Sequence, residues 1–162
     1  MNATSLDTFV QLSSALTGVD SQQLKPAIDP IGIADEYLAF LQKNVDAAAL
    51  TRLFDTFTQL ISSGNSPKEA AGTILADTNQ GWLARSLIKL WLLGTWYDPN
   101  NPGNALQVIS PEAYTESLVW QMMQAHPMGF SKLSFGYWAQ PPPSLNQFIT
   151  FAPDNTGGTT HA

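Results

Sequence analysis

The sequence predicts a single all-α domain of about six helices that ends in an irregular, aromatic-rich C-terminal segment. Two observations favour this fold. Apolar residues recur at intervals of three and four over most of the chain before Pro127, which is the spacing of one helix face. Strand-like alternation is confined to a few residues near Gln147 to Phe151. We therefore expect an all-α domain over residues 1–152 and a flexible tail over residues 153–162.

Capping residues bound the first two predicted helices. Ser5 is a candidate N-cap for the first, and Gly18 lies just beyond its end. After a polar linker, Asp29 and Pro30 restart the chain, with the proline at the first position of the second helix. The apolar residues at helical spacing in these two segments are Leu6, Phe9, Val10, Ala15, Leu16, Ile33, Tyr37, Phe40 and Leu41.

The next two predicted helices have the clearest signals. One is strongly amphipathic and ends at Gly64. Ser66, Pro67 and Glu69 then form a capping box with a proline just inside the start of a short helix. The apolar faces of the two helices are Leu50, Leu53, Phe54, Phe57, Leu60 and Ile61, then Ala71, Ile74 and Leu75.

The stretch from Trp82 to Tyr97 is predicted to be one helix around which the chain is organised. Arg85, Ser86 and Lys89 share a polar strip, but past Trp91 apolar groups surround the helix. A helix that is apolar all round is buried all round, here by its own chain or by a partner. Its length of roughly 24 Å is below the ~30 Å of a bilayer core, and it carries two cations, so we do not expect it to span a membrane.

A turn-rich loop from Asp98 to Asn104 follows, and Ser110 and Pro111 then start a last helix that Pro127 ends. From Pro99 onward the chain carries only four charged residues, Glu112, Glu116, Lys132 and Asp154. The same region has eight aromatic residues: Tyr114, Trp120, Phe130, Phe135, Tyr137, Trp138, Phe148 and Phe151. The aromatic segment after Pro127 either packs over the helices of its own chain or anchors a partner, because Trp and Tyr are enriched at the centres of interfaces.

Composition excludes several classes of function. Charged residues make up 12% of the 162 residues, about half the usual share, so part of the exterior is expected to be uncharged and available for contact. A net charge of −6 argues against nucleic-acid binding. The absence of cysteine excludes disulfides, cysteine-ligated zinc and iron–sulfur clusters. The start of the sequence shows neither the basic nor the apolar region of an export signal.

We expect no catalytic, cofactor-binding or metal-binding residues. The sequence has no glycine-rich phosphate-binding motif, and its two histidines, His126 and His161, are too isolated for a metal site or a catalytic triad. Glu112 and Glu116 suit the first turns of a helix better than an acid–base pair. The residues thus favour a protein-binding module over an enzyme.

Four segments resemble one family in content and order. These are FVQLSSALTG (9–18), IKLWLLGTWYD (88–98), YTESLVW (114–120) and FGYWAQPPP (135–143). The chain is similar over about residues 6–143 to the small subunits of bacterial membrane-bound, FAD-dependent sorbitol, fructose and glucose dehydrogenases. The family's twin-arginine export signal is not matched here, since the only arginines are Arg52 and Arg85.

The resemblance implies a periplasmic accessory subunit with no cofactor of its own. FAD would be bound by a large catalytic flavoprotein, and a multihaem cytochrome c subunit would carry electrons onward. The small subunit would hold the flavoprotein non-covalently and support its maturation or export, with no nucleic acid bound and no membrane span of its own. Its predicted interface consists of Trp91, Trp96, Tyr97, Phe130, Phe135, Tyr137 and Trp138.

Two alternatives stay open at this point. One is a self-contained helical enzyme that uses Asp98, Glu112 or Glu116 as a general base. The other is a free-standing helical protein whose aromatic residues are all internal.

Overall fold

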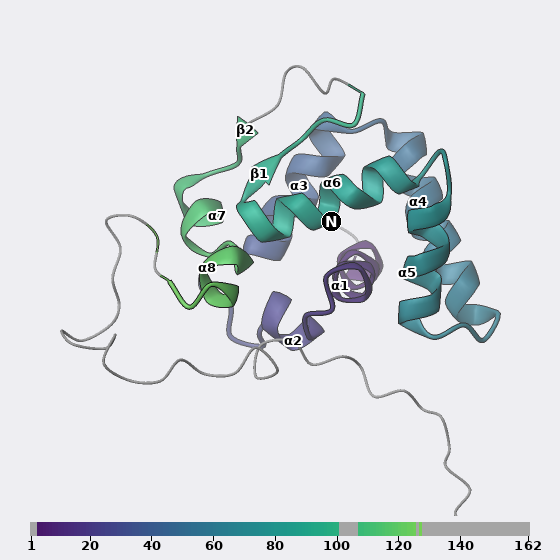
Figure 1. The fold of residues 1–162 in the computed structure, drawn as a ribbon, viewed down its shortest axis with the longest axis horizontal. Helices are drawn as coiled ribbons and strands as arrows, with labels where there is room; N and C mark the ends of the chain where they lie inside the picture. The colour runs from purple at the N-terminus through teal and green to yellow at the C-terminus, as the bar shows by residue number, and fades with distance from the viewer. Residues whose placement is uncertain (1–2, 101–106, 126, 128–162) are drawn as a thin grey trace, which may run out of the picture.

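The computed structural model describes residues 3–100, 107–125 and 127, and these form an all-α domain, which confirms the predicted fold class. Apart from the helices, the described residues contain one short antiparallel pair of strands (Figure 1). The elements are α1 (Ala3–Thr17), α2 (Ser21–Leu24), α3 (Ile33–Asn44), α4 (Ala47–Ser62), α5 (Pro67–Ala76), α6 (Gly81–Leu93), β1 (Thr95–Trp96), β2 (Gln107–Val108), α7 (Pro111–Thr115) and α8 (Leu118–Met122).

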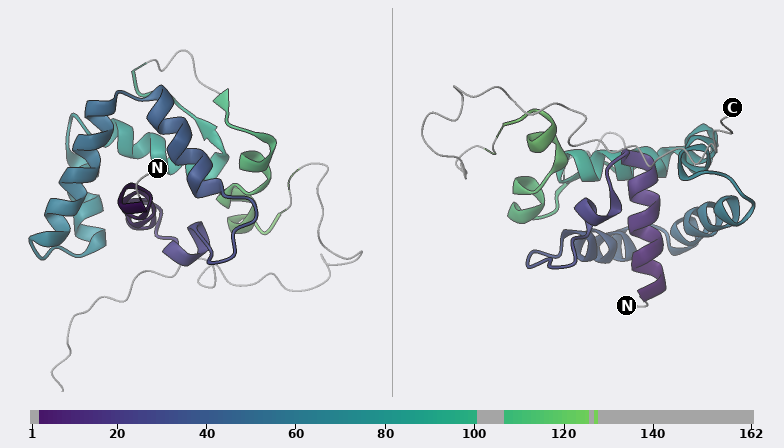
Figure 2. Two further views of the ribbon diagram at one scale, coloured as in Figure 1. Left: turned by 180° about the vertical axis from the view of Figure 1, so that it is seen from behind. Right: turned by 90° about the horizontal axis from the view of Figure 1, so that it is seen from below.

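The helix at the centre of the fold is α1. It contacts α2, α3, α4, α5 and α6, and Figure 1 shows it end-on with these helices around it. The right-hand view of Figure 2 shows α1 lengthwise, running across the direction of α6. Phe9, which is fully buried, stacks on Trp91 of α6 with ring centroids 6.0 Å apart and contacts Phe54 of α4 at 6.4 Å. The prediction that residues 82–97 form the organising element is therefore wrong.

The predicted helix over residues 82–97 is also too long. It ends at Leu93, because Gly94 adopts the left-handed conformation (φ 64°) and its N–H still donates to the carbonyl of Leu90. The next two residues, Thr95 and Trp96, pair with Val108 and Gln107 as strands. The described residues leave one strip of α6 exposed, so its own chain does not bury it on all sides, and burial of that strip by a partner stays a prediction.

The start of α3 differs from the prediction at Pro30. The Asp29 carboxylate accepts a hydrogen bond from the N–H of Gly32 at 2.7 Å, which closes a turn, and Gly32 has φ 73°. A residue with positive φ cannot continue a right-handed helix, so α3 begins at Ile33. At α1 the structure also differs, since the helix already includes Ala3 and Thr4 before the predicted cap at Ser5. The polar linker contains the short helix α2.

The single helix predicted after Pro111 is broken into α7 and α8. In a continuous helix the carbonyl of Tyr114 would accept from the N–H of residue 118. Instead it accepts from the Ser117 hydroxyl at 3.0 Å and from the Trp120 indole Nε1 at 2.8 Å. These side-chain bonds replace the helical bond and end α7 at Thr115. The residues with strand-like alternation near 147–151 and the predicted tail lie outside the described residues.

The predicted capping box at the start of α5 is confirmed. Ser66 Oγ accepts from the N–H of Glu69 at 3.3 Å, and the Glu69 carboxylate accepts from the N–H of Ser66 at 2.8 Å. These bonds from the Ser66 backbone and side chain lower the pKa of Glu69. None of the helices in the described part of the chain is both long and apolar enough to cross a membrane.

Glu69→Gln is expected to lower the thermal unfolding temperature at neutral pH. A carboxylate with a lowered folded-state pKa stabilises the fold above its unfolded pKa of about 4.3, and this stabilisation is lost as the pH falls through the folded value. The difference between wild type and variant should therefore shrink as the pH falls below about 4. Thermal unfolding at several pH values measures it, and Asp55→Asn, an exposed carboxylate on α4, controls for charge alone. A difference that does not change with pH would contradict this role for the capping box.

Candidate docking surface

Two of the predicted interface residues lie inside the chain. Trp91 is 4% exposed, and its ring meets that of Tyr37 edge-on at 5.0 Å in addition to stacking on Phe9. Trp96 is 6% exposed and meets Phe40 edge-on at 6.0 Å. Tyr97 is only partly buried, and the Lys89 ammonium lies 4.8 Å from the centre of its ring. The other predicted interface residues, Phe130, Phe135, Tyr137 and Trp138, lie outside the described residues.

The outer side of α6 carries an exposed row of apolar and cationic side chains, which we call the α6 stripe. Its members Trp82, Arg85, Lys89 and Leu93 are three or four residues apart and so share one helix face. Trp82 is 64% exposed, and the Arg85 guanidinium lies 5.6 Å from the centre of its ring. Tyr97, next to Lys89, extends the row beyond the helix. Of the predicted interface residues that the structure describes, Tyr97 alone lies on this surface.

The composition of the α6 stripe suits a protein interface. Trp, Tyr and Arg are the residues that most often dominate binding energy at interfaces. The guanidinium of Arg85 is also fixed, because it donates to the carbonyl of Leu75 at 2.8 Å. Sequence reasoning missed Trp82, although its spacing from Arg85 and Lys89 placed it on their strip. Ser86, which was assigned to that strip, is instead buried.

The phenol of Tyr37 is the only described group for which burial strongly shifts the pKa. Its burial raises the pKa of Tyr37, and the nearby Glu36 carboxylate raises it further. The hydroxyl therefore stays protonated over the ordinary pH range. It donates a long hydrogen bond of 3.5 Å to the carbonyl of Ala113 in α7. Tyr37 thus links α3 to α7 in the interior.

The three carboxylates that could serve as a general base each lie in a turn or at the end of a helix. Asp98 accepts a hydrogen bond from the N–H of Asn100 at 2.8 Å, in the turn after β1. Glu112 is exposed in the first turn of α7, and Glu116 follows the end of that helix. In the described part of the chain, no three His, Asp or Glu residues are grouped closely enough to hold a metal ion. The general-base role of these carboxylates stays a prediction.

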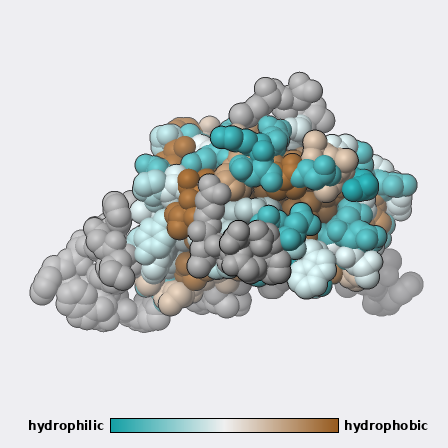
Figure 3. All heavy atoms as spheres, turned by 90° about the horizontal axis from the view of Figure 1, so that it is seen from above, coloured by the Kyte–Doolittle hydropathy of each residue, from teal (hydrophilic) through white to brown (hydrophobic). Residues whose placement is uncertain are grey.

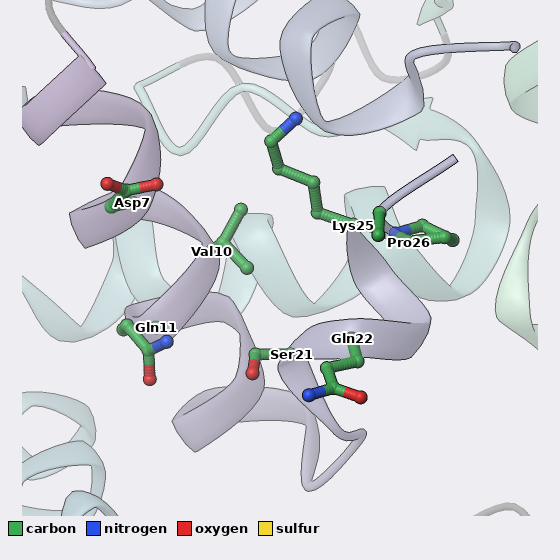
Figure 4. Close-up of a pocket in the computed structure, with 8 residues that line it drawn as sticks. Asp7, Val10, Gln11, Ser21, Gln22, Lys25 and Pro26 are labelled. Carbon is green, nitrogen blue, oxygen red and sulfur yellow. The ribbon is translucent and has the colours of Figure 1, made fainter. Parts of the chain in front are cut away.

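Two hollows lie on the surface around α2. The larger, of about 420 Å³, lies between α1 and α2 (Figure 4). Its lining mixes polar side chains, among them Asp7 and Gln11 from α1, with apolar ones such as Val10. Lys25 also lines it, and the Lys25 ammonium lies 3.4 Å from the Asp35 carboxylate. The smaller hollow, which we call the α2–α8 groove, has a volume of about 170 Å³. Its main lining residues are Leu24, Ile28, Asp29, Ile31, Ile33, Trp91, Glu116, Leu118 and Gln121.

Apolar side chains are exposed on several parts of the described surface. Figure 3 shows brown apolar patches between teal polar groups on the face seen from above. The large exposed apolar residues are Ile28, Ile31, Ile61, Trp82, Leu93, Val108 and Met123. Ile28 and Ile31 border the α2–α8 groove, and Trp82 and Leu93 belong to the α6 stripe. The α6 stripe and the groove are therefore the two candidate docking surfaces.

No protein-family model matches this chain, and no curated protein matches it.

Proposed function

We propose that this chain is the non-catalytic small subunit of an FAD-dependent sugar or alcohol dehydrogenase of the sorbitol type. It binds the catalytic flavoprotein and supports that protein's maturation or export. FAD belongs to the flavoprotein, and a multihaem cytochrome c subunit accepts the electrons. The complex acts in the periplasm, and the small subunit is held at the membrane through its partners.

The observation that carries this proposal is the α6 stripe. Trp82 exposes 64% of its surface next to the fixed guanidinium of Arg85. Burying such a side chain against a partner is favourable, because apolar area leaves water and the cation–aromatic contact is desolvated. Arg85 and Lys89 make the stripe cationic in a chain whose net charge is −6, so an acidic patch on the partner would be attracted to it and would help to set the partner's orientation. If the small subunit binds the folded flavoprotein and not the unfolded one, it stabilises the folded flavoprotein by mass action.

Co-expression of the tagged chain with a large FAD-dependent dehydrogenase subunit from the same organism tests the proposal. We expect the flavoprotein to co-purify with bound FAD and to lose solubility when the small chain is omitted. Trp82→Ala should weaken the complex by about tenfold or more, because truncating an interface tryptophan commonly removes 2 kcal/mol or more, by the rough measure of alanine scanning. Titration of the flavoprotein with purified variants gives the affinity.

Ile61→Ala is the matched control, since Ile61 is an apolar side chain 37% exposed on α4, away from the stripe. It should leave the affinity unchanged. The proposal fails if the flavoprotein is equally soluble and active without the small chain and never co-purifies with it. If the complex forms but Trp82→Ala binds as well as wild type, the function stands and the α6 stripe is not its interface.

A further inference from the structure

We propose that the α2–α8 groove binds a peptide segment of a protein partner that inserts one side chain of leucine or phenylalanine size and places a lysine or arginine next to it. The groove lies between the loop that joins α2 to α3 and the helix α8, which Figures 1 and 2 both show side by side. It is separate from the exposed α6 stripe, and the inference does not depend on the proposed dehydrogenase partner.

The size of the groove sets the size of its occupant. Its volume of about 170 Å³ is similar to that of a cavity of ~150 Å³ that accepts benzene inside a protein. It is well below the ~300–1,000 Å³ of a pocket for a drug-sized ligand or cofactor. Leu24, Trp91 and Leu118, all less than 10% exposed, form its apolar interior. One apolar side chain therefore fits, and a larger ligand does not.

The rim of the groove is apolar and uncovered. Ile28 is 88% exposed and Ile31 is 46% exposed, and both line the groove from the α2–α3 loop. Large apolar side chains held together in water at a concave site are typical of a binding surface. A peptide segment that lies across this rim would bury both isoleucines as well as its own anchor side chain.

The charged residues that line the groove indicate what kind of peptide segment it binds. Asp29 from the loop and Glu116 from the α7–α8 junction both line the groove, and none of the described lining residues is Lys, Arg or His. The ammonium of the neighbouring Lys25 faces Asp35, at 3.4 Å. An acidic segment would be repelled by Asp29, whereas a basic side chain beside the anchor would be attracted by it. An apolar anchor with an adjacent cation thus matches the lining.

The groove is held in shape before anything binds. The turn at Asp29 is closed by the 2.7 Å hydrogen bond from the N–H of Gly32, and Pro26 and Pro30 restrict the backbone on either side. A preformed site loses less conformational entropy on binding than a flexible one, which favours affinity for a short segment. Trp91, on the groove's inner wall, is itself fixed by ring contacts with Phe9 and Tyr37.

Selection from a random peptide library against the full chain tests this inference. Peptides that bind wild type are recovered after depletion on the double variant Ile28→Ser/Ile31→Ser, which changes only exposed loop side chains. We expect a consensus of Leu or Phe next to Lys or Arg. The affinity of a consensus peptide should fall by about tenfold or more in the double variant, and also when its basic residue is replaced by glutamate. The indole N–H resonance of Trp91 should shift on titration with the peptide.

Ile61→Ser is the matched control and should bind the consensus peptide as wild type does. Thermal unfolding checks that the double variant is folded. The inference is overturned if no peptide distinguishes wild type from the double variant, or if the selected peptides are acidic. It is also overturned in favour of a second copy if the chain forms dimers that the double variant abolishes. The inserted side chain is refuted if a consensus peptide binds as tightly after its Leu or Phe is replaced by alanine.

Discussion

Gly94→Ala is expected to destabilise this protein more than any other single methyl group added to it. Gly94 has φ 64°, which costs a residue with a Cβ atom about 1–2 kcal/mol. A Cβ atom there would also clash with the backbone carbonyl of Ala113 in α7. Because backbone cannot move aside as a side-chain end can, we expect a total loss of about 3 kcal/mol or more. Urea unfolding of the purified variant measures it.

Gly32→Ala is the matched control. Gly32 has nearly the same backbone conformation, with φ 73°, but a Cβ atom there would meet nothing within 4 Å. Gly32→Ala should lower the free energy of unfolding only by the cost of a positive φ, about 1–2 kcal/mol. The difference between the two variants is then the cost of separating α7 from the end of α6. Equal losses would show that the close approach to Ala113 contributes nothing to stability.

Trp91→Ala is expected to have the next largest effect, a loss of about 3–5 kcal/mol in the free energy of unfolding. The indole joins α1 to α3, because it packs between the rings of Phe9 and Tyr37. Alanine would leave a cavity among helices that all pack on α1. Since a small domain is stable by only about 5–15 kcal/mol, the variant should be folded but close to its limit. The shift of the urea midpoint reports this loss.

Trp91→Phe is the companion variant, since it keeps an aromatic ring in contact with its neighbours. It also removes the indole N–H that lacks a hydrogen-bond partner. We expect a loss of less than about 2 kcal/mol, well below that of alanine. If both variants unfold at the same urea concentration, the aromatic contacts of Trp91 do not stabilise the core and its assignment as a core residue fails.

The parts of the fold that sequence predicted well depend on short-range signals. The capping box at Ser66 and Glu69 involves residues three apart, so its residue types identify it without knowledge of the rest of the chain. The end of α4 before Gly64, which has φ 93°, is a similar case. In contrast, the end of α6 was misplaced because Leu92, Leu93, Trp96 and Tyr97 continue an apolar helical pattern across Gly94. The strand partner that draws Trp96 out of that pattern, Gln107, lies beyond a loop.

The central position of α1 could not be predicted from its sequence. Its middle contains Ser13 and Ser14, which suggest a solvent-facing side, yet Ser13 is fully buried and its hydroxyl has no hydrogen-bond partner in the described structure. Tertiary packing decides this burial, not helix periodicity. The candidate site could not be predicted from sequence for the same reason. The residue type of Trp91 and Trp96 suggested an interface, but whether a tryptophan is buried depends on what packs around it. Trp82 carries the same residue type and is the tryptophan that α6 exposes.

The packing of α1 also has a consequence for the order of folding. Each helix that covers α1 comes later in the chain, and Phe9 finds its partners Phe54 and Trp91 only after α4 and α6 have been made. At about 5–20 residues per second, a ribosome needs roughly 4–16 s to make the intervening chain. Until then the apolar face of α1 lacks the part of its native cover that α6 supplies. The nascent N-terminal helix is therefore a potential client for a chaperone before the chain can form its own core.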